Sequence, residues 1–449
     1  MDEREDQARV TALTLALEGI RSAEPRSAVK NYLTRSGEKL VLRDGTEIPV
    51  RGEVYVVGAG KASGGMAQAI EEILGDKIAG GVVSVPEELV GKYSTKKIRI
   101  VGATHPKASQ KSVEAGRMVL ETLTNLREDD LVIALFSGGG SALLEYPVEG
   151  VTIDEIGEFS ILLMKRGADI FELNAVRKHL SRIKGGWLAR HAQPARVLAL
   201  MISDVVGDRM DTIASGPTVP DPTTFQDAYN ILKKYSAWEE APASVRAYIE
   251  KGLRGAAPET PKPDDPVFSR VVNRVIASNM QSLEAMATKA QNLGYRPLIL
   301  TSMLEGEARE VGKVIASILR EVRKSGKPLP PPLVILAGGE TTVTVRGRGI
   351  GGRNQELALS IAIGIRGLRG VAVACIGSDG RDGPTDVAGA VVGGSTYDRA
   401  VAMGLKPEEF LVENNSYEFF RAIGGHIKTG YTGTNVNDFI VAVIEDYEM

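Results

Sequence analysis

Several short loops in this sequence combine glycine with a charged or hydroxyl side chain, which is the chemistry that an anion-binding site requires. The first, Gly58-Ala-Gly-Lys-Ala-Ser63, follows an apolar, β-branched run and precedes a helical stretch. Gly58 and Gly60 would let the backbone approach an anion, the helix start presents free N–H groups, and Lys61 adds a mobile positive charge. A tight turn with a solvated lysine explains the same residues equally well.

A second loop, Phe136-Ser-Gly-Gly-Gly-Ser-Ala142, lies between a buried strand-like run and a helical segment. Three adjacent glycines carry a large entropic cost on folding, so a close approach to a ligand explains them better than a flexible turn does. Their N–H groups would form a nest of donors with two hydroxyls beside it. Leu143 stands where a nucleophile elbow needs glycine, which disfavours a serine hydrolase. The predicted binding residues here are Ser137, Gly138, Gly139, Gly140 and Ser141.

A basic segment, residues 173–186, has apolar residues at helical spacing and four clustered cations. Such a charge run is usually a solvent-facing helix surface. Asn174 and Arg177 would nevertheless lie on adjacent turns of one face, where they could hold a carboxylate or a phosphate together. We include both among the candidate binding residues.

Acidic residues follow two of the strand-like runs. Asp204 and Asp208 are hard oxygen ligands that could hold Mg²⁺ or another divalent cation, directly or through water. Asp379, Asp382 and Asp386 provide a candidate base and further metal ligands, and of these Asp379 and Asp386 are the predicted catalytic residues. Turn and helix-capping roles are the alternative for each of these aspartates.

Two further loops occur in the second half. Gly338-Gly-Glu-Thr-Thr342 follows a strand-like run, and the stretch from Arg346 to Glu356 opens a helix. Arg353 follows two glycines at that helix start, which favours an arginine-bearing anion loop. Glu340 and Asn354 join the candidate substrate- or phosphate-binding residues.

The sequence completes neither of the common nucleotide-binding fingerprints. Tyr55 stands where a P-loop would need glycine before Lys61. Gly347, Gly349 and Gly352 match GxGxxG, but the later acidic residue of a dinucleotide-binding site is missing. A nicotinamide-dependent enzyme is therefore disfavoured.

The elements that must position these loops alternate between apolar strand-like runs and helical patterns. Continuous apolar runs predict strands at 53–57, 81–85, 98–101, 131–136 and 197–202, and later at 271–277, 296–301, 333–337, 342–345, 371–376 and 439–444. This alternation predicts parallel α/β sheets, whose ligands bind at the carboxyl ends of the strands. A break with four prolines between Gly252 and Pro266 predicts two domains, 1–255 and 266–449.

Composition narrows the class of protein. Of 449 residues, 43% are hydrophobic and 25% are charged, and the net charge of −3 leaves no basic footprint for nucleic acid. No apolar run approaches the roughly 20 residues that span a membrane, and the N-terminus lacks a signal-peptide pattern, so we expect a cytoplasmic protein. The single cysteine, Cys375, lies in an apolar run typical of a core. The four histidines do not pair at zinc-ligand spacing.

Taken together, the loops resemble those of glycerate kinases that carry a MOFRL domain. The matching motifs, in order, are GAGKAS, FSGGGSALL, LNAVRKHLSRIKGG, SDVVGDRMDTIASGPTVPD, GGETTV, GGRNQE, GSDGRDGPTDVAGA and TGTNVND, from about Val54 to Asp438. The resemblance implies a Rossmann-like parallel α/β/α sandwich, a smaller C-terminal α/β domain of MOFRL type, and an active site in the cleft between them. It also implies catalytic roles for Lys61 and Arg353.

The resemblance implies a kinase that transfers the γ-phosphoryl group of ATP to D-glycerate with a divalent metal, often giving 2-phosphoglycerate. Glycine nests, two cations and a metal on aspartates fit this reaction, because phosphoryl transfer depends on positioning and on neutralising phosphoryl charge. We expect ATP and D-glycerate as the small-molecule partners, and leave the oligomeric state open. The alternatives are an NAD(P)H-dependent hydroxypyruvate reductase, a label given to some relatives, and a non-catalytic sugar-phosphate-binding protein.

Overall fold

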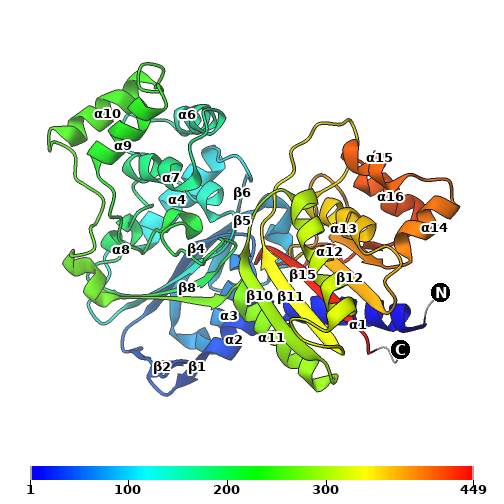
Figure 1. Ribbon diagram of the computed structural model, residues 1–449. Coiled ribbons are helices and arrows are strands. Elements are labelled where there is room, and N and C mark those ends of the chain that lie inside the picture. The colour runs from blue at the N-terminus through cyan, green and yellow to red at the C-terminus, as the bar shows by residue number, and fades with distance from the viewer. Residues whose placement is uncertain (1–2, 447–449) are drawn as a thin grey trace. The chain divides into compact units, whose positions relative to one another are not determined.

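The computed structural model describes residues 3–446, and its contacts divide them into two compact units (Figure 1). The first unit is Pro25–Ile276, and the second joins the residues up to Glu24 with those from Ala277 onward. Both units are α/β, as predicted. Within the described residues, no helix is long and apolar enough to span a membrane.

The first unit is built on a six-stranded sheet of order β6-β5-β4-β7-β8-β9. The strands from β6 to β8 pair in parallel, which confirms the predicted Rossmann-like sheet. A small antiparallel sheet, β1-β2-β3, precedes it. The strands are β1 (Leu33–Ser36), β2 (Lys39–Leu42), β3 (Glu47–Pro49), β4 (Val54–Ala59), β5 (Ile78–Pro86), β6 (Ile98–Ala103), β7 (Leu131–Phe136), β8 (Arg196–Ile202) and β9 (Val271–Ala277).

Helices follow most of these strands, as the alternating sequence pattern predicts. They are α2 (Pro25–Tyr32), α3 (Ser63–Leu74), α4 (Gln110–Thr122), α5 (Gly140–Leu143), α6 (Ile153–Lys165), α7 (Ile170–His179), α8 (Trp187–His191), α9 (Phe225–Lys234) and α10 (Ala243–Leu253), with short 3₁₀ turns at Gly75–Lys77, Glu87–Lys92, Ile213–Ser215 and Pro266–Arg270. Helices α6, α7, α9 and α10 pack around a second apolar core, separate from the core under the sheet.

The second unit contains a mixed six-stranded sheet of order β10-β11-β15-β12-β13-β14, in which only β10 and β11 pair in parallel. The strands are β10 (Arg296–Leu304), β11 (Leu333–Gly339), β12 (Val371–Gly377), β13 (Gly389–Gly393), β14 (His426–Ile427) and β15 (Asp438–Ile444). The helices are α1 (Glu3–Ser22), α11 (Asn279–Asn292), α12 (Ala308–Ser325), α13 (Arg353–Gly364), α14 (Thr396–Ala402), α15 (Pro407–Val412) and α16 (Ser416–Ile423).

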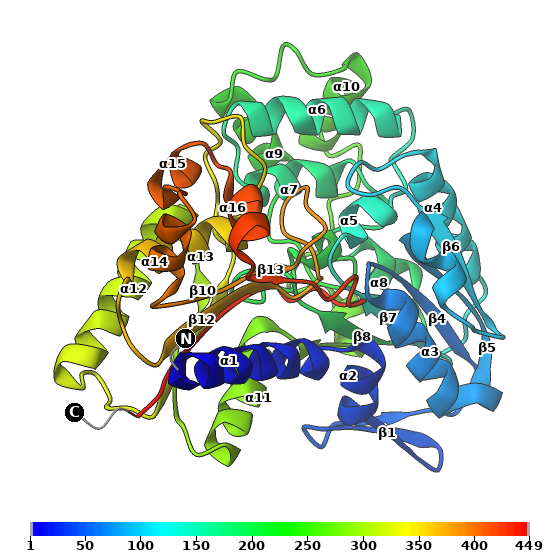
Figure 2. The same ribbon diagram turned by 90° about the vertical axis from the view of Figure 1, so that its right-hand side faces the viewer.

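The predicted domain boundaries, 1–255 and 266–449, differ from those of the structure. Helix α1 belongs to the second unit, where it packs on β12 and α11 and buries Ala12 and Leu15 (Figure 2). The proline-rich stretch does not end the first unit, because the chain continues into β9 at the edge of the first sheet. Neither pairing could be seen in the sequence, since both join segments more than 60 residues apart.

The predicted strand at 342–345 was also wrong. Only Thr342 forms an isolated bridge, to Glu307, and the chain then leaves the sheet. Short strands at 33–49, 389–393 and 426–427 were missed because they lack long apolar runs.

Candidate functional site

The loops after β4 and β7 interlock at the carboxyl end of the first sheet. The Lys61 backbone N–H donates to the Gly138 carbonyl at 2.9 Å, and the Ala62 N–H donates to Ser137 Oγ at 3.0 Å. Gly60 has a φ of 148°, and a Cβ there would collide with Ser137. The two glycine loops therefore form one rigid surface at the start of α3.

Two of the predicted ligand-binding residues have structural roles in this arrangement. Ser137 is buried, and its hydroxyl is occupied by Ala62 N–H and by Ser63 Oγ at 3.1 Å. Gly58 lies within β4, where a side chain would strike the backbone of Leu135 on the neighbouring strand. Neither residue contacts open space, so close packing explains both without a ligand.

His105 joins this surface and was missed at the sequence level. It follows β6, and its ring lies against Gly139, which has a φ of 84°. Burial, together with the charge of Lys61, lowers the pKa of His105 to about 4, so its imidazole is neutral at pH 7. The sequence signal was its place directly after a strand, but a single histidine outside any motif did not stand out.

The basic segment, residues 173–186, was predicted to hold an anion. In the structure its side chains instead form hydrogen bonds to the triple-glycine loop and to Ser215 beside it. Helix α7 begins with a capping box in which Asp169 accepts from the Phe171 and Glu172 N–H groups. One turn further on, Asn174 is buried and accepts from Ser215 Oγ at 3.2 Å. Ser215 in turn lies 2.8 Å from Ser141 Oγ. Asn174 is thus linked to the loop through hydroxyls.

Two cations, the buried Lys184 and the half-buried Arg177, converge on the Ser141 carbonyl. Arg177 Nη2 donates to it at 3.3 Å and Lys184 Nζ at 3.0 Å. Lys184 also pairs with the buried Glu145 at 2.9 Å, whereas Arg177 Nε is buried without a partner among the described residues. Burial lowers the pKa of both cations, and Glu145 opposes that effect. The segment therefore does not form the solvent-facing helix that such a charge run usually indicates.

The two candidate metal ligands have different surroundings. The Asp204 carboxylate lies so close to Gly138 that a Cβ on that glycine would overlap it. Asp208 sits in a turn with a φ of 54°, and its N–H donates to the Val205 carbonyl at 3.0 Å. Residues 3–446 contain no group of three or more acidic, histidine or cysteine side chains that could hold a metal alone. Any ion here would need phosphate or water oxygens as well.

In the second unit, the guanidinium of Arg353 is fixed at the N-terminus of α13. Its Nε donates to Asp438 Oδ2 at 2.6 Å, its Nη2 to Asp438 Oδ1 at 3.1 Å, and its Nη1 to Glu340 Oε1 at 2.5 Å. Burial opposes the charge of Arg353, but Asp438 and Glu340 outweigh it and raise the pKa of the guanidinium. Burial raises the pKa of Asp438 to about 6, although Arg353 opposes the rise. Arg353 and Glu340 are thus brought together.

Asp382 fixes the N-terminus of α13, the helix that begins at Arg353. Its carboxylate caps α13 by accepting from the backbone and side-chain amides of Asn354 and Gln355, at 2.9 to 3.2 Å. A Cβ at Gly352 would overlap the same carboxylate. Asn354 is buried and engaged in this cap, so its predicted role in substrate binding is replaced by a structural one.

The two candidate bases have separate partners. Asp379 Oδ1 accepts from the Arg381 N–H at 3.0 Å. Asp379 and Asp438 both lie near Gly377, since a Cβ built on this glycine would be about 3.5 Å from each carboxylate. Asp386 is exposed and accepts from the Tyr417 hydroxyl at 2.8 Å and from Lys428 at 3.2 Å. Tyr417 and Lys428 lower its pKa. Asp379 therefore neighbours the Arg353 cluster, and Asp386 belongs to a surface ion pair.

Comparison with known proteins gives consistent matches. A family model described as a domain of unknown function, DUF4147, matches residues 11–250, and the MOFRL family model matches residues 333–438. A glycerate 2-kinase of Pyrococcus horikoshii is 46% identical over 97% of both chains. A D-glycerate 2-kinase of Thermotoga maritima is 44% identical over 87% of this chain and 90% of its own.

A solved structure agrees with these sequences. The crystal structure of glycerate kinase from Thermotoga maritima matches 98% of this chain and 100% of its own, with 40% identity and a TM-score of 0.87. The likeness therefore extends over nearly the whole chain.

Proposed function

This chain belongs to the family of glycerate kinases that carry a MOFRL domain, and we propose that it transfers the γ-phosphoryl group of ATP to the 2-hydroxyl of D-glycerate. In this reaction the bond between the γ-phosphorus and the β–γ bridging oxygen breaks. A bond forms between that phosphorus and the C2 oxygen, and the hydroxyl proton passes to a base. The products are ADP and 2-phosphoglycerate.

The observation that carries the proposal is the rigid loop pair formed by Lys61 and the triple glycine. A phosphoryl group in flight spreads negative charge over its oxygens, so a kinase must offer cations and backbone donors that are already in place. The interlocked loops hold Lys61 beside the triple glycine, and Arg177 and Lys184 both donate to the Ser141 carbonyl of the same loop. We assign Lys61 to the transferring phosphoryl group.

Arg353 supplies a second cation with a planar fork, suited to a carboxylate or to phosphoryl oxygens. Asp438 and Glu340 restrict its rotamers, so little conformational freedom remains to be lost when the substrate binds. We assign Asp379 as the base for the 2-hydroxyl proton, because it neighbours this cluster, whereas Asp386 is engaged by Tyr417 and Lys428.

The residues present fit a divalent cation shared with the ATP phosphates. Mg²⁺ usually binds one or two carboxylates and completes its shell with water and phosphate oxygens, and it would neutralise phosphate charge here. Asp204, beside Gly138, is the ligand that we assign. Asp204→Asn should raise the Mg²⁺ concentration needed for half-maximal activity, and Asp208→Asn serves as the matched control. An unchanged Mg²⁺ dependence in the Asp204 variant would move the metal elsewhere.

The decisive experiment identifies the product. Protein, ATP, Mg²⁺ and D-glycerate should yield ADP, and ³¹P and ¹³C NMR of the product should show the phosphate on C2. Phosphorylation at C3 would contradict the assigned hydroxyl. Oxidation of NADH by hydroxypyruvate without ADP formation would favour the reductase, and glycerate binding without either reaction would favour a non-catalytic protein.

A further inference from the structure

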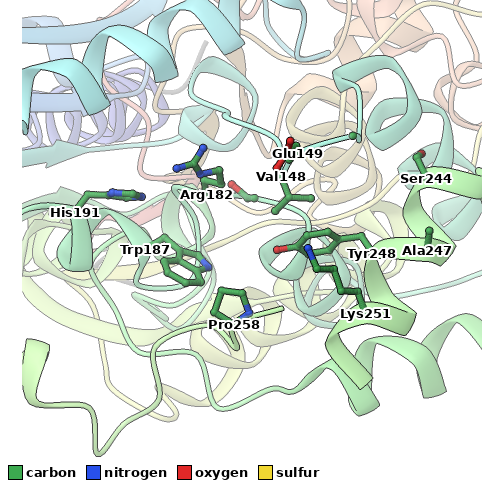
Figure 3. Close-up of a pocket in the computed structure, with 12 residues that line it drawn as sticks. Val148, Glu149, Arg182, Trp187, His191, Ser244, Ala247, Tyr248, Lys251 and Pro258 are labelled. Carbon is green, nitrogen blue, oxygen red and sulfur yellow. The ribbon is translucent and has the colours of Figure 1, made fainter. Parts of the chain in front are cut away.

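A cavity of about 750 Å³ opens in the first unit, away from the loops that carry Lys61 and the triple glycine (Figure 3). Residues from α8, from α10 and from the chain around Val148 line it, and none of the residues assigned above to catalysis or metal binding does. Its volume falls in the range of about 300 to 1,000 Å³ that small-molecule sites occupy. It is therefore large enough for a ligand of its own.

Two aromatic rings form opposite parts of the wall. Trp187 comes from α8 and Tyr248 from α10, and Figure 3 shows both rings directed into the cavity. Tyr248 packs against Phe225 with ring centroids 5.9 Å apart, and the Arg190 guanidinium lies 5.4 Å from the Trp187 ring. Both rings thus pack against residues outside the cavity lining and also present apolar surface to the cavity. Such surfaces favour stacking with a planar, aromatic ligand.

Two cations face the same space without neutralising partners. The side chains of Arg182 and Lys251 are exposed, and neither forms an ion pair with any residue that the structure describes. The neighbouring Arg190, by contrast, pairs with Asp265. Glu149 is the one acidic residue of the lining. The cavity therefore carries a positive field that attracts an anion.

A buried polar atom at the edge of the cavity also lacks a partner. The His191 ring bonds to the backbone of Arg182, and its Nε2 is buried without a hydrogen bond from the described residues. Buried polar atoms are rarely left unsatisfied in folded proteins. In Figure 3 the ring points along the wall towards Trp187, so a ligand between the aromatic residues could supply the missing bond.

We propose that this cavity binds a nucleoside phosphate, with its base against Trp187 and Tyr248 and its phosphates on Arg182 and Lys251. A phosphorylated ligand without a base would use the cations but leave both aromatic surfaces uncovered. The cavity is linked to the triple-glycine loop only through a chain of contacts: Ser181 lines it and donates to Glu145, Glu145 pairs with Lys184, and Lys184 donates to the Ser141 carbonyl. The inference concerns binding alone and does not rest on the kinase reaction.

Tryptophan fluorescence provides the test. The chain has two tryptophans, Trp187 in the cavity and Trp238 in the core of the helical cluster, so Trp238→Phe isolates the signal of Trp187. Titration with ADP should change this emission in a saturable way, adenosine should bind more weakly, and inorganic phosphate more weakly still. Arg182→Gln and Lys251→Gln should each weaken ADP binding about fivefold or more, and Lys165→Gln, an exposed lysine outside the cavity, should not.

Equilibrium dialysis of labelled ADP with the wild-type protein and the Arg182→Gln/Lys251→Gln double variant makes the test independent of fluorescence and of the fold of the Trp238 variant. Wild-type protein should bind ADP both at the proposed kinase site and in this cavity, so the loss of one ADP equivalent in the double variant, with the other retained, supports the proposal. Equal ADP binding by the two proteins would overturn it. Inorganic phosphate that competes as well as ADP does would overturn the assignment to a nucleotide.

Discussion

The Asp438 carboxylate holds the Arg353 guanidinium by two hydrogen bonds, from Nε to Oδ2 at 2.6 Å and from Nη2 to Oδ1 at 3.1 Å. Glu340 Oε1 accepts a third hydrogen bond, from Nη1. A guanidinium held in this way has one orientation, and a lysine could not adopt it because its ammonium is a point charge.

Arg353→Ala should lower kcat by about 10³-fold, the scale seen when an arginine that stabilises a phosphoryl transition state is lost. KM should change less, since the interaction strengthens in the transition state. Arg353→Lys should recover little of the activity. Steady-state kinetics measure both variants, with Arg366→Lys, a surface arginine paired with Asp398, as the control. A kcat near that of the wild type in the alanine variant would contradict a catalytic role for Arg353 and leave it a structural one.

Lys61→Ala should also lower kcat more than it raises KM for ATP, because its charge lies beside the triple-glycine loop. The melting temperature should stay close to that of the wild type, because alanine keeps the backbone hydrogen bond from residue 61 to the Gly138 carbonyl. Lys165→Ala is the matched exposed lysine. Equal kcat for the two lysine variants would leave Lys61 as a solvated turn residue.

Activity should depend on pH through Asp438. Its pKa is raised to about 6, so the carboxylate is charged above that pH and protonated below it. Protonation weakens the bidentate pair, and kcat should therefore fall as pH drops through about 6. Asp438→Asn should have a lower kcat at pH 7.5 and should lose this limb of the profile. Measuring kcat of both proteins between pH 5 and 8 tests this prediction. If the Asp438→Asn variant lost activity at low pH as the wild type does, the titration would belong to another group.

Asp379→Asn should lower kcat strongly, whereas Asp386→Asn should leave it within about twofold, because an exposed ion pair contributes little to stability or to positioning. Both variants should have wild-type circular dichroism. The reverse order of effects in a kinetic comparison would make Asp386 the base.

Lys184→Met should destabilise the first unit by about 3 to 5 kcal/mol, because it leaves the buried Glu145 charge uncompensated. Lys184→Met/Glu145→Leu should recover part of that loss. Urea unfolding measures both, and Lys165→Met is the surface control. A single variant as stable as the wild type would mean that Glu145 finds another partner or takes up a proton.

The chemical inventory of the candidate site could be predicted from local sequence. Lys61 was predicted in a glycine turn directly after an apolar run, and Arg353 after two glycines at a helix start, because strand ends and helix starts are local features. The parallel pairing of β4 to β8 was predicted from the alternation of apolar and helical patterns, but the order of the strands was not.

The partners of each side chain were decided only by the tertiary structure. Asp438 meets Arg353 across 85 residues of chain, and α1 packs beside β12 from the opposite end of the sequence. Ser137, Gly58 and Asn354 look like ligand-binding residues in the sequence but fill steric and hydrogen-bonding needs of the fold. Glycine and polar residues serve close packing and ligand approach equally well, because both need a small side chain or a satisfied hydrogen bond. Which of the two applies depends on the neighbour that folding brings, and residue type and spacing do not encode that neighbour.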